Sequence, residues 1–389
     1  MQKRKFPEAL VLPQAGPKPV VRSKYGLLCG SGLVFSPGPG ACQVAAIIGN
    51  WLPGGVICSG SKSVEHVCGA FGLTAGPGAS IIPVSRGAMG RVWCLDLGAE
   101  RYAVKELFGE SDEESVRLEV AFTAHLDSAG IRLPGSLPGR GGRFLQELAA
   151  DHGGGWLRLY RWIDGVPVDL ADPGLAVQIG DLAGRLHALA WPAEGAVDPW
   201  YDRVPGPATW EQLADAARGQ GAGWGEAMGG HAGLLRDLAD LVTPMAGDRL
   251  VTCHRDLHPD NVLVEASGEL AVLDWDDAGP ACPDRELAGL LMFWHGHDDG
   301  TADDGAVQRT LAAYRAARGP GRLRNEQSFG MYIACRLNFL EAQASVALDP
   351  GAAPEHRAYA SSEISDTLTR LPMPSLISHL ISLAVTTLR

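Results

Sequence analysis

The stretch His254-Arg255-Asp256-Leu257-His258-Pro259-Asp260-Asn261, followed by Val272-Leu273-Asp274-Trp275-Asp276, decides the fold of this chain. Between the two segments, residues 262–264 and 270–273 predict two strands joined by a tight turn. A hairpin brings its entry and its exit together at one end. Polar side chains that flank the two strands are therefore expected to face one cleft.

Three polar side chains of this stretch can carry chemistry. Asn261 lies at the entry to the hairpin and Asp274 at its exit, and both offer oxygen atoms, which hard cations such as Mg²⁺ prefer. Asp256 precedes them, where its carboxylate can receive the proton of a hydroxyl group. Kinases position the phosphate acceptor and the metal ions with this spacing. The pattern predicts phosphoryl transfer, with Asp256 as the catalytic residue and Asn261 and Asp274 as metal ligands.

The nucleotide half of such a site is expected upstream. Residues 101–107 predict a strand that carries Lys105, which is similar to the strand lysine that contacts the α- and β-phosphates of ATP. The segment before it contains Ser85, Gly87 and Gly90, small residues that would let backbone N–H groups approach phosphate oxygens. Glycines between strands also occur in ordinary turns, but the lysine that follows favours a phosphate loop.

A helix is expected between these two halves. The sequence Ser-Asp-Glu-Glu at residues 111–114 is a capping box, and it predicts a helix that runs to about residue 127 and stops at Gly130. Glu119 lies two turns into this helix, on the face of Val116 and Val120. We expect Glu119 to form the ion pair that orients Lys105, and a solvent-exposed glutamate is the alternative.

Together these residues resemble the aminoglycoside phosphotransferase family, the small-molecule branch of the protein-kinase-like fold. The resemblance covers about residues 64–371. It implies an α+β, bilobal protein-kinase-like fold, with a small, mainly antiparallel β N-lobe and a larger helical C-lobe. It also implies ATP and Mg²⁺ as cofactors. In the family a strand and an apolar-x-Gly turn form the adenine hinge, which residues 159–165 match, so the backbone of Arg161 and Trp162 is expected to contact adenine.

Two departures from the family pattern concern the catalytic segment. The family more often has Gly where Arg255 stands, and more often Asp where Glu286 stands. These departures leave phosphoryl transfer as expected but make the acceptor harder to infer. His187 lies in a recurrent Leu-His segment of the family and is interpreted as a structural core histidine.

The acceptor is expected to be a small molecule. After Asp274 only a few residues precede a predicted helix near residues 284–293, which leaves no room for the activation segment of a protein kinase. The leading hypothesis is an ATP-dependent O-phosphotransferase that acts on an aminoglycoside-type antibiotic or related cationic polyol. The alternatives are a metabolic kinase for choline, homoserine, a sugar or a fructosamine, and a non-catalytic nucleotide-binding relative.

Charge supports a cationic acceptor. The 389 residues carry a net charge of −12, and the first sixty hold six basic residues against one acidic residue, leaving about −17 for the remainder. An acidic body disfavours nucleic acid as a partner and attracts cations. Four aspartates, Asp298, Asp299, Asp303 and Asp304, form an acidic loop after the metal region. This loop either borders the acceptor pocket or is simply solvated.

The chain divides into three expected parts. Residues 1–60 are rich in Gly and Pro and predict a poorly ordered extension, residues 61–165 the N-lobe, and residues 166–389 the helical C-lobe. The 8 cysteines form no C-x-x-C pair, so we expect neither zinc nor disulfides, and a cytoplasmic location. No apolar stretch is long enough for a membrane span. The final helix, near residues 375–388, can contact either the body or another subunit, which leaves the oligomeric state open.

Overall fold

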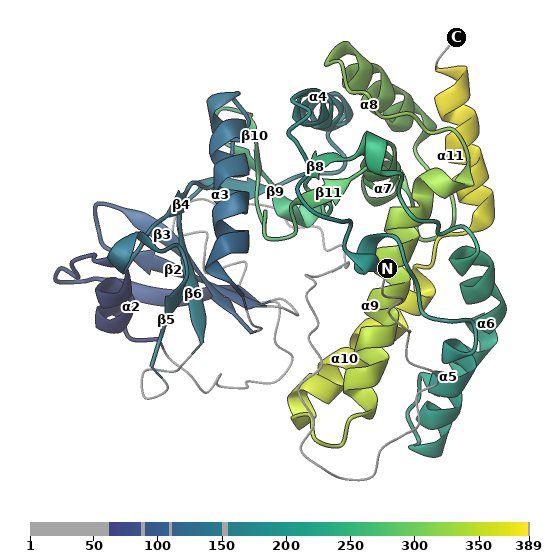
Figure 1. The fold of residues 1–389 in the computed structure, drawn as a ribbon, viewed down its shortest axis with the longest axis horizontal. Coiled ribbons are helices and arrows are strands. Elements are labelled where there is room, and N and C mark those ends of the chain that lie inside the picture. The colour runs from purple at the N-terminus through teal and green to yellow at the C-terminus, as the bar shows by residue number, and fades with distance from the viewer. Residues whose placement is uncertain (1–61, 87–89, 109–110, 150–154, 388–389) are drawn as a thin grey trace, which may run out of the picture.

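The structure, a computed structural model, describes residues 62–86, 90–108, 111–149 and 155–387. The predicted extension and Gly87 of the predicted phosphate loop lie outside these ranges. Figure 1 shows a sheet with helices α2 and α3 at one end of the molecule and a larger group of helices at the other end, joined through short strands. This arrangement confirms the expected α+β, bilobal fold with a small antiparallel sheet and a larger helical part.

The N-lobe sheet is antiparallel throughout. Its strands follow the order β1-β2-β3-β6-β4, and β5 also pairs with β6. They are β1 Ser80–Arg86, β2 Gly90–Asp96, β3 Arg101–Leu107, β4 Ser136–Leu137, β5 Gln146–Glu147 and β6 Trp156–Arg161. Alternate residues such as Leu95, Val104 and Leu157 are fully buried against helix α2, Val64–Phe71. The opposite side chains of β3 and β6, among them Lys105, are left for the site.

Helix α3, Glu113–Ser128, connects the sheet to the catalytic hairpin. Its N-cap is Asp112, whose side chain accepts a hydrogen bond from the Ser115 backbone N–H at 2.8 Å, and not Ser111 as the capping box implied. Gly130, with φ +78°, follows its end. Phe122 of this helix packs edge-on against Trp275 with ring centroids 5.8 Å apart. The predicted helix is therefore confirmed, and it contacts the segment that carries Asp274.

The catalytic hairpin forms as its sequence predicts. Strand β9, Val262–Glu265, pairs antiparallel with β10, Leu270–Val272, and Gly268 takes the positive φ of +85° that the turn requires. Strand β7, Gly165–Pro167, extends this sheet beyond β9. Two further short strands, β8 Val251–Cys253 and β11 Gly279–Ala281, pair with each other on either side of the hairpin in the chain.

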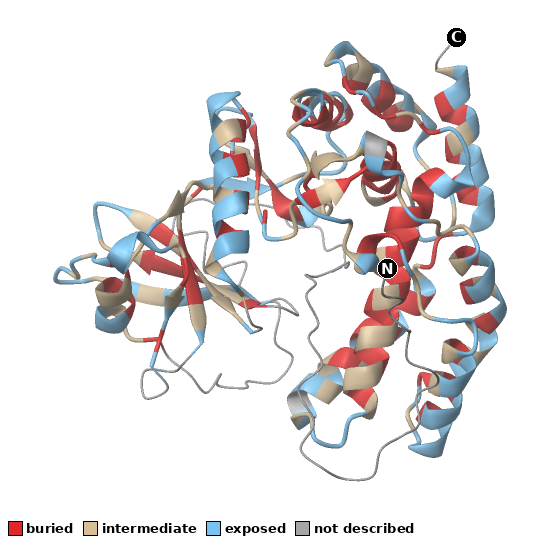
Figure 2. Cartoon of the chain, in the orientation of Figure 1, coloured by how far each residue is buried: buried red, intermediate tan, exposed pale blue. Residues whose placement is uncertain are grey.

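The C-lobe is helical and packs around α7 and α9. Its α-helices are α4 Leu175–Ala188, α5 Thr209–Gly219, α6 Gly225–Ala239, α7 Pro283–His295, α8 Asp304–Ala316, α9 Gly330–Leu348, α10 Pro354–Thr369 and α11 Pro374–Thr386. Single turns of 3₁₀-helix lie at Arg140–Gly142, Pro199–Tyr201, Gly247–Arg249, Pro259–Asn261 and Glu326–Phe329. Figure 2 shows α7 and much of α9 as buried, and Phe293 is the one residue of α7 that is not.

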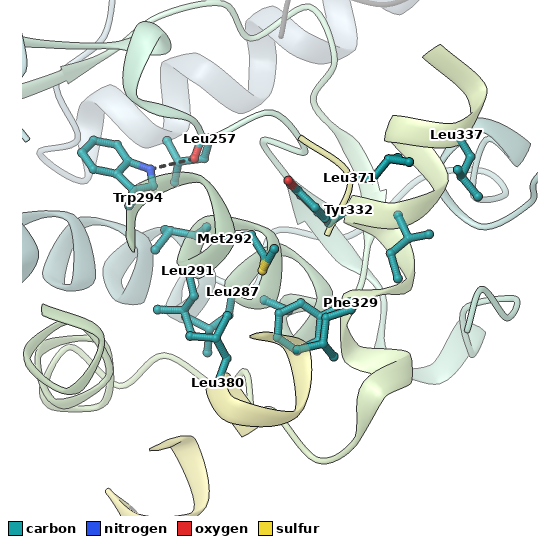
Figure 3. Packing of buried hydrophobic residues seen from close by; sticks show 14 of the residues in the cluster. Leu257, Leu287, Leu291, Met292, Trp294, Phe329, Tyr332, Leu337, Leu371 and Leu380 are labelled. Carbon is teal, nitrogen blue, oxygen red and sulfur yellow. Dashed lines mark hydrogen bonds between the residues drawn. The ribbon is translucent and has the colours of Figure 1, made fainter. Parts of the chain in front are cut away.

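The last helix belongs to this core. Leu376, Ile377 and Leu380 of α11 are almost fully buried, and Figure 3 shows Leu380 beside Leu287 and Leu291 of α7. The expected C-terminal helix therefore contacts the body of its own chain. Within the described residues no single helix is long and apolar enough to cross a bilayer; only α10 and α11 taken together, bent by 59° at their junction, meet that length and composition.

Helix α4 has no side-chain cap. The helix begins at Leu175 after Gly174, and the Asp172 side chain instead accepts the Gly174 backbone N–H at 2.8 Å in the preceding turn.

Helix α4 contacts α8 through Thr310, whose hydroxyl donates to the Ala176 carbonyl at 2.9 Å. That hydroxyl has only one proton, so it must accept the 2.7 Å hydrogen bond it shares with His295 Nε2. His295 is thus held as a donor through Nε2.

His295 is expected to make the fold sensitive to acid. Burial lowers its pKa to about 4, below the roughly 6.5 of an unfolded histidine. Between these values the unfolded chain binds more protons, so stability is complete above pH 6.5 and falls as the pH drops toward 4. His295→Gln, which keeps an N–H at this position, should reduce this loss by about 1–3 kcal/mol. Urea unfolding at pH 7.5 and pH 5 measures it, with exposed His356→Gln as control. An unchanged pH slope in His295→Gln would contradict this role.

Candidate active site

Two backbone positions in the catalytic segment take left-handed conformations. Arg255 has φ +69° and Asp274 has φ +58°, a region that glycine enters without steric cost. This conformation explains why a glycine suits the position of Arg255. The Arg255 side chain compensates locally: Nε donates to the Asp277 carbonyl, and the guanidinium lies 3.9 Å from the centre of the Tyr201 ring. Arg255 therefore has a structural role in this turn.

The buried carboxylate of Glu286 holds the backbone turn at Arg255. Glu286 is 2% exposed and accepts hydrogen bonds from the Arg255 backbone N–H and from His187 Nε2, the latter at 2.6 Å. Burial raises the pKa of Glu286, but these hydrogen bonds outweigh it, and its pKa is lowered overall. His187 is completely buried and also bonds Tyr314. The interpretation of His187 as a structural core histidine fits these contacts.

The loop that carries Asp256 is tied to the strand that ends at Asp274. His254 Nε2 bonds the Leu273 carbonyl at 2.9 Å, and the Leu273 N–H donates to the Asn261 carbonyl at 2.8 Å. On the other side, the Trp294 indole N–H of α7 donates to the Leu257 carbonyl at 3.0 Å (Figure 3). These bonds hold Asn261 next to the residue that precedes Asp274, as the hairpin predicted.

Asn261 and Asp256 contact each other directly. The Asn261 Nδ2 donates to the Asp256 carbonyl oxygen at 2.9 Å and to its Oδ2 at 3.1 Å. The amide nitrogen is thereby turned to Asp256, and the amide oxygen has no hydrogen bond within the described residues. This oxygen, at the entry of the hairpin, and the carboxylates of Asp274 and the neighbouring Asp276, after its exit, are all oxygen donors. Such a set fits a hard cation.

Lys105 of β3 reaches the hairpin. Its Nζ lies 2.5 Å from Asp274 Oδ1 and 2.9 Å from Asp276 Oδ2. Burial alone would lower the pKa of Lys105, but the two carboxylates outweigh it and raise the pKa. The strand lysine and the predicted metal ligand Asp274 are therefore in contact.

The predicted ion pair between Glu119 and Lys105 is wrong. Both Glu119 oxygens instead contact Arg158, at 2.5 and 2.9 Å, and Arg158 also lies 2.8 Å from Asp276 Oδ1. The reason is the sheet register, which sets Arg158 of β6 directly opposite Lys105 on β3. The forked guanidinium takes both carboxylate oxygens, as a lysine cannot. Glu119 thus reaches Lys105 only through Arg158 and Asp276.

Asp276 was not among the residues that the sequence predicted for the site, yet it contacts both Lys105 and Arg158. It accepts from Lys105, from Arg158 and, at 3.2 Å, from the Tyr160 hydroxyl. Burial raises the pKa of Asp276, but the two cations outweigh it and lower the pKa to about 2. Asp276 follows Asp274 by two residues, and this alternation in Asp-Trp-Asp could have indicated that both carboxylates face one side.

Arg158→Met is expected to destabilise the protein strongly, by about 3–5 kcal/mol, because Glu119 is left buried without its counter-charge. The double variant Glu119→Leu with Arg158→Met should regain at least half of this loss, because it buries no unpaired charge. Urea unfolding monitored by tryptophan fluorescence gives both free energies. If the double variant were less stable than Arg158→Met alone, the unpaired Glu119 charge would not be the cause.

The predicted phosphate loop has strand residues at both ends. Ser85 belongs to β1 and pairs with Val92 of β2, and Gly90 begins β2. A Cβ atom on Gly90 would lie 2.4 Å from the Glu106 carbonyl oxygen of β3. Close packing of the sheet is therefore sufficient reason for glycine at position 90, separately from any phosphate contact.

The hinge differs in part from expectation. The Arg161 N–H donates to the Gly135 carbonyl at 2.9 Å, and the Trp162 N–H donates to the Arg101 carbonyl at 3.3 Å. Neither N–H group can reach adenine without breaking these bonds, because β6 continues to pair on both sides. The N–H of Ile163, the next residue, has no hydrogen bond within the described residues, and it is the better donor for an adenine ring.

Two cavities lie in the C-lobe, at and next to the segment that carries Asp256. A narrow one of about 40 Å³ is lined by Asp256, Arg255, Asp277 and aromatic residues of α7, α9 and the Pro199–Tyr201 turn. A wider one of about 390 Å³ lies over His258, Pro259 and Asp260. Phe293 and Tyr332 line both. His258 Nε2 is 3.5 Å from Asp256 Oδ2; burial lowers the pKa of His258, but Asp256 outweighs it and the pKa is raised.

Comparison with known proteins agrees with this geometry. The model described as the phosphotransferase enzyme family matches residues 80–322, well over half of the chain. The chain belongs to the phosphotransferase enzyme family. It is therefore a small-molecule kinase that phosphorylates a hydroxyl group, as the motifs predicted. No curated protein sequence matches the chain.

Solved structures show that this phosphotransferase shares its fold with small-molecule kinases. Spectinomycin phosphotransferase, crystallised with ADP and spectinomycin, is 15% identical, with 83% of this chain and 97% of that chain covered and a TM-score of 0.54. A microcompartment-associated aminopropanol kinase is 16% identical, covering 78% and 94%, with a TM-score of 0.53. An aminoglycoside phosphotransferase from Alicyclobacillus acidocaldarius is 15% identical, covering 87% and 99%, with a TM-score of 0.52.

The four aspartates of the acidic loop do not together line the wider cavity. Of its four aspartates only Asp298 lines the wider cavity, where it lies 3.5 Å from Arg370. Asp303 caps α8 and Asp304 pairs with His379 at 2.7 Å, while Asp299 accepts two hydrogen bonds from Thr301. Of the two alternatives for this loop, the solvated loop fits Asp299, Asp303 and Asp304, because their side chains serve the loop and the start of α8.

Two polar residues of α9, Asn338 and Glu341, line neither cavity. Asn338 of α9 donates to the carbonyl oxygens of Trp200 and Arg203, both at 2.8 Å. Glu341, one turn further, lines neither cavity, and burial raises its pKa. Cys253, next to the catalytic string, is fully buried, and burial raises its pKa far above the usual range. A thiolate nucleophile is not favoured there.

Proposed function

We propose that this phosphotransferase transfers the γ-phosphate of ATP to a hydroxyl group of a small molecule bound in the cavities beside Asp256. One observation carries the proposal: Asp256 contacts Asn261, at the entry of the hairpin that leads to Asp274, at 3.1 Å, and it also lines a cavity of the C-lobe. A carboxylate in this position can meet the acceptor hydroxyl on one side and the phosphoryl group on the other.

Each residue of the proposed site has a role that its contacts support. Asp256 orients the acceptor hydroxyl; the oxygen forms the new bond to phosphorus as the bond to ADP breaks, and the proton passes to Asp256. Because the transition state of phosphoryl transfer is loose, Asp256 can act mainly by positioning. Lys105 contacts the phosphates, and Glu119 holds Arg158 and thereby Asp276 in place.

Asn261, Asp274 and Asp276 are proposed to hold Mg²⁺, which when bound neutralises charge on the β- and γ-phosphates. The loop that includes Ser85, Gly87 and Gly90 is proposed to cover the phosphates, and the segment from Arg161 through Trp162 to receive adenine, with Ile163 as donor. Residues 61–165 would then be the nucleotide lobe and residues 166–389 the acceptor lobe, after an extension over residues 1–60. We also propose a cytoplasmic location, which suits an enzyme that uses ATP.

An aminoglycoside-type antibiotic or related cationic polyol is the first candidate acceptor. The carboxylates of Asp256, Asp260 and Asp298 line the two cavities, and the acidic body would attract cations over longer range. In that case the enzyme would confer antibiotic resistance. The second candidate is a metabolic acceptor that carries a negative group, and a specific observation favours it: Arg336 and Arg370 line the same wider cavity.

A substrate screen tests the proposal. Purified protein is incubated with ATP, Mg²⁺ and a panel of hydroxyl compounds that includes aminoglycosides, choline, sugars and hydroxy amino acids, and ADP release is measured. We expect at least one acceptor to release ADP well above the rate of the Asp256→Asn variant, with a phosphate monoester identified by mass spectrometry. Equal rates in the two proteins for every acceptor would overturn the proposed reaction, and resistance on expression would select the antibiotic.

A further inference from the structure

Arg336 stands out in helix α9 because it is charged, buried and stacked on aromatic rings. Only 9% of the residue is exposed. Its guanidinium carbon lies 5.2 Å from the centre of the Tyr332 ring, one helical turn earlier, and 5.7 Å from that of Phe293 on α7. The two rings are themselves 5.0 Å apart and nearly perpendicular. All three side chains line the wider cavity.

The Arg336 guanidinium lacks a protein partner. Within the described residues it makes no hydrogen bond, no carboxylate lies within 4.0 Å of it, and its Nε is buried without an acceptor. A buried cation without a counter-charge is costly, and stacking on aromatic rings returns only about 1–2 kcal/mol. Arg158 of the same protein, which is also buried, at 2% exposed, has Glu119 and Asp276 as partners. The contrast indicates that a partner of Arg336 comes from outside the chain.

The other charges around the cavity have partners already. Asp298 lies 3.5 Å from Arg370, and Asp260 lies 3.7 Å from His258. Glu363 of α10 is a buried acid in the surroundings of Arg336, but it forms no ion pair with it, and burial raises the pKa of its carboxyl group. The charge left to face the cavity is therefore the positive charge of Arg336.

A series of side-chain contacts connects the wider cavity to the proposed catalytic residue, Asp256. Phe293 lines both cavities, and its ring centre is 5.7 Å from that of His258. His258 in turn lies 3.5 Å from Asp256. A small molecule that places one end at Arg336 can therefore extend over Phe293 and His258 toward Asp256. Its hydroxyl group would then lie where phosphoryl transfer is proposed to occur.

We infer that Arg336 binds a carboxylate of the acceptor, so that the natural substrate is a hydroxy acid, including hydroxy amino acids. Arg336 offers a planar set of N–H donors that suits a carboxylate, and the aromatic rings fix its orientation. The inference rests on the proposed phosphotransfer and selects among its acceptors: it favours an anionic or zwitterionic molecule over the cationic polyol that net charge alone suggested.

Matched pairs of acceptors test this directly. The probes are L-serine with L-serinamide, L-homoserine with its amide, and glycerate with glyceramide, so each pair differs only in the carboxylate. The wild type is expected to turn over at least one acid with a kcat/KM tenfold or more above that of its amide. Arg336→Met should raise the KM for the acid at least tenfold and leave the amide unchanged, so the preference disappears. Arg336→Lys should retain part of it.

A structural role of Arg336 would give a different result, because lost packing would lower activity on both members of a pair and leave their ratio intact. Arg309→Met serves as the matched control, since Arg309 is an exposed arginine of α8 that lines neither cavity. It should keep the wild-type preference. An unchanged ratio in Arg336→Met, or a wild type that prefers the amides or only cationic acceptors, would overturn the inference while phosphotransfer stands.

Calorimetric binding of the same acids and amides separates the inference from the reaction. If no acceptor releases ADP, the proposed reaction has failed, and binding alone decides the role of Arg336. Binding of an acid, but not of its amide, to the wild type, weakened at least tenfold in Arg336→Met, would support it. Absence of binding of every acid to the wild type, or equal affinity in both proteins, would overturn it.

Discussion

Asp256→Asn is expected to bind ATP almost as tightly as the wild-type protein and to lose kcat on the order of 10²–10⁴-fold or more. The asparagine can still accept the hydrogen bond that Asn261 Nδ2 gives to Oδ2 of Asp256 at 3.1 Å, so the loop should keep its conformation. It cannot take a proton from the acceptor, and it removes the charge that orients the hydroxyl group. Steady-state ADP release and calorimetric titration with ATP measure the two effects.

The control for this substitution is Asp181→Asn, which removes an exposed carboxylate of α4 that pairs only with Arg185 of the same helix. Its kcat should stay within about twofold of the wild type, because such surface pairs contribute little. If Asp256→Asn kept more than about a tenth of the wild-type kcat, Asp256 would not be the catalytic residue, and the acceptor would have to be oriented from elsewhere in the cavities.

Asp274→Ala is expected to abolish metal-dependent binding of nucleotide. It removes one of three oxygen donors, and it also frees Lys105, which holds Asp274 at 2.5 Å. Lys105→Ala should act differently, raising the KM for ATP and lowering kcat while the dependence on Mg²⁺ persists, because Asn261, Asp274 and Asp276 all remain. The separation follows from chemistry: carboxylates bind the metal, whereas an ammonium group binds phosphate oxygens.

Titration of nucleotide binding against Mg²⁺ distinguishes the two variants. In Lys105→Ala the affinity for ATP should still rise with Mg²⁺, from a weaker starting value. In Asp274→Ala, Mg²⁺ should have no effect at concentrations that saturate the wild type. Titration curves of the same shape for both variants would contradict this division of roles, and would indicate that Lys105 and Asp274 act only as one structural pair.

The sequence predicted those parts of the site that depend on short spacings. The hairpin between Asn261 and Asp274 is set by two strands and a turn only a few residues long, and the Lys105 strand is decided by its own side-chain pattern. Glu119 was placed correctly in α3 and given the wrong partner. Its actual partner, Arg158, comes from β6, and only the register of the sheet places it opposite Lys105.

Long-range contacts account for the other differences. The hinge N–H groups of Arg161 and Trp162 are taken by Gly135 and Arg101, which lie far away in the chain. The lining of the wider cavity combines the catalytic loop with α7, α9 and the segment between α10 and α11. A run of aspartates could be seen in the sequence, but the buried arginine of the wider cavity that forms no ion pair, Arg336, could not, because its surroundings come from separate helices.

The contacts of Lys105 and Arg158 with Asp274 and Asp276 are ion pairs that connect the two lobes. Two cations of the N-lobe sheet bind two carboxylates of the C-lobe hairpin at the place where a nucleotide would enter. To reach Lys105 and Asp274, a nucleotide and its metal ion would have to replace these ion pairs. Such a competition lowers the apparent affinity for ATP, so the strength of the ion pairs would help to set the ATP concentration at which the enzyme works.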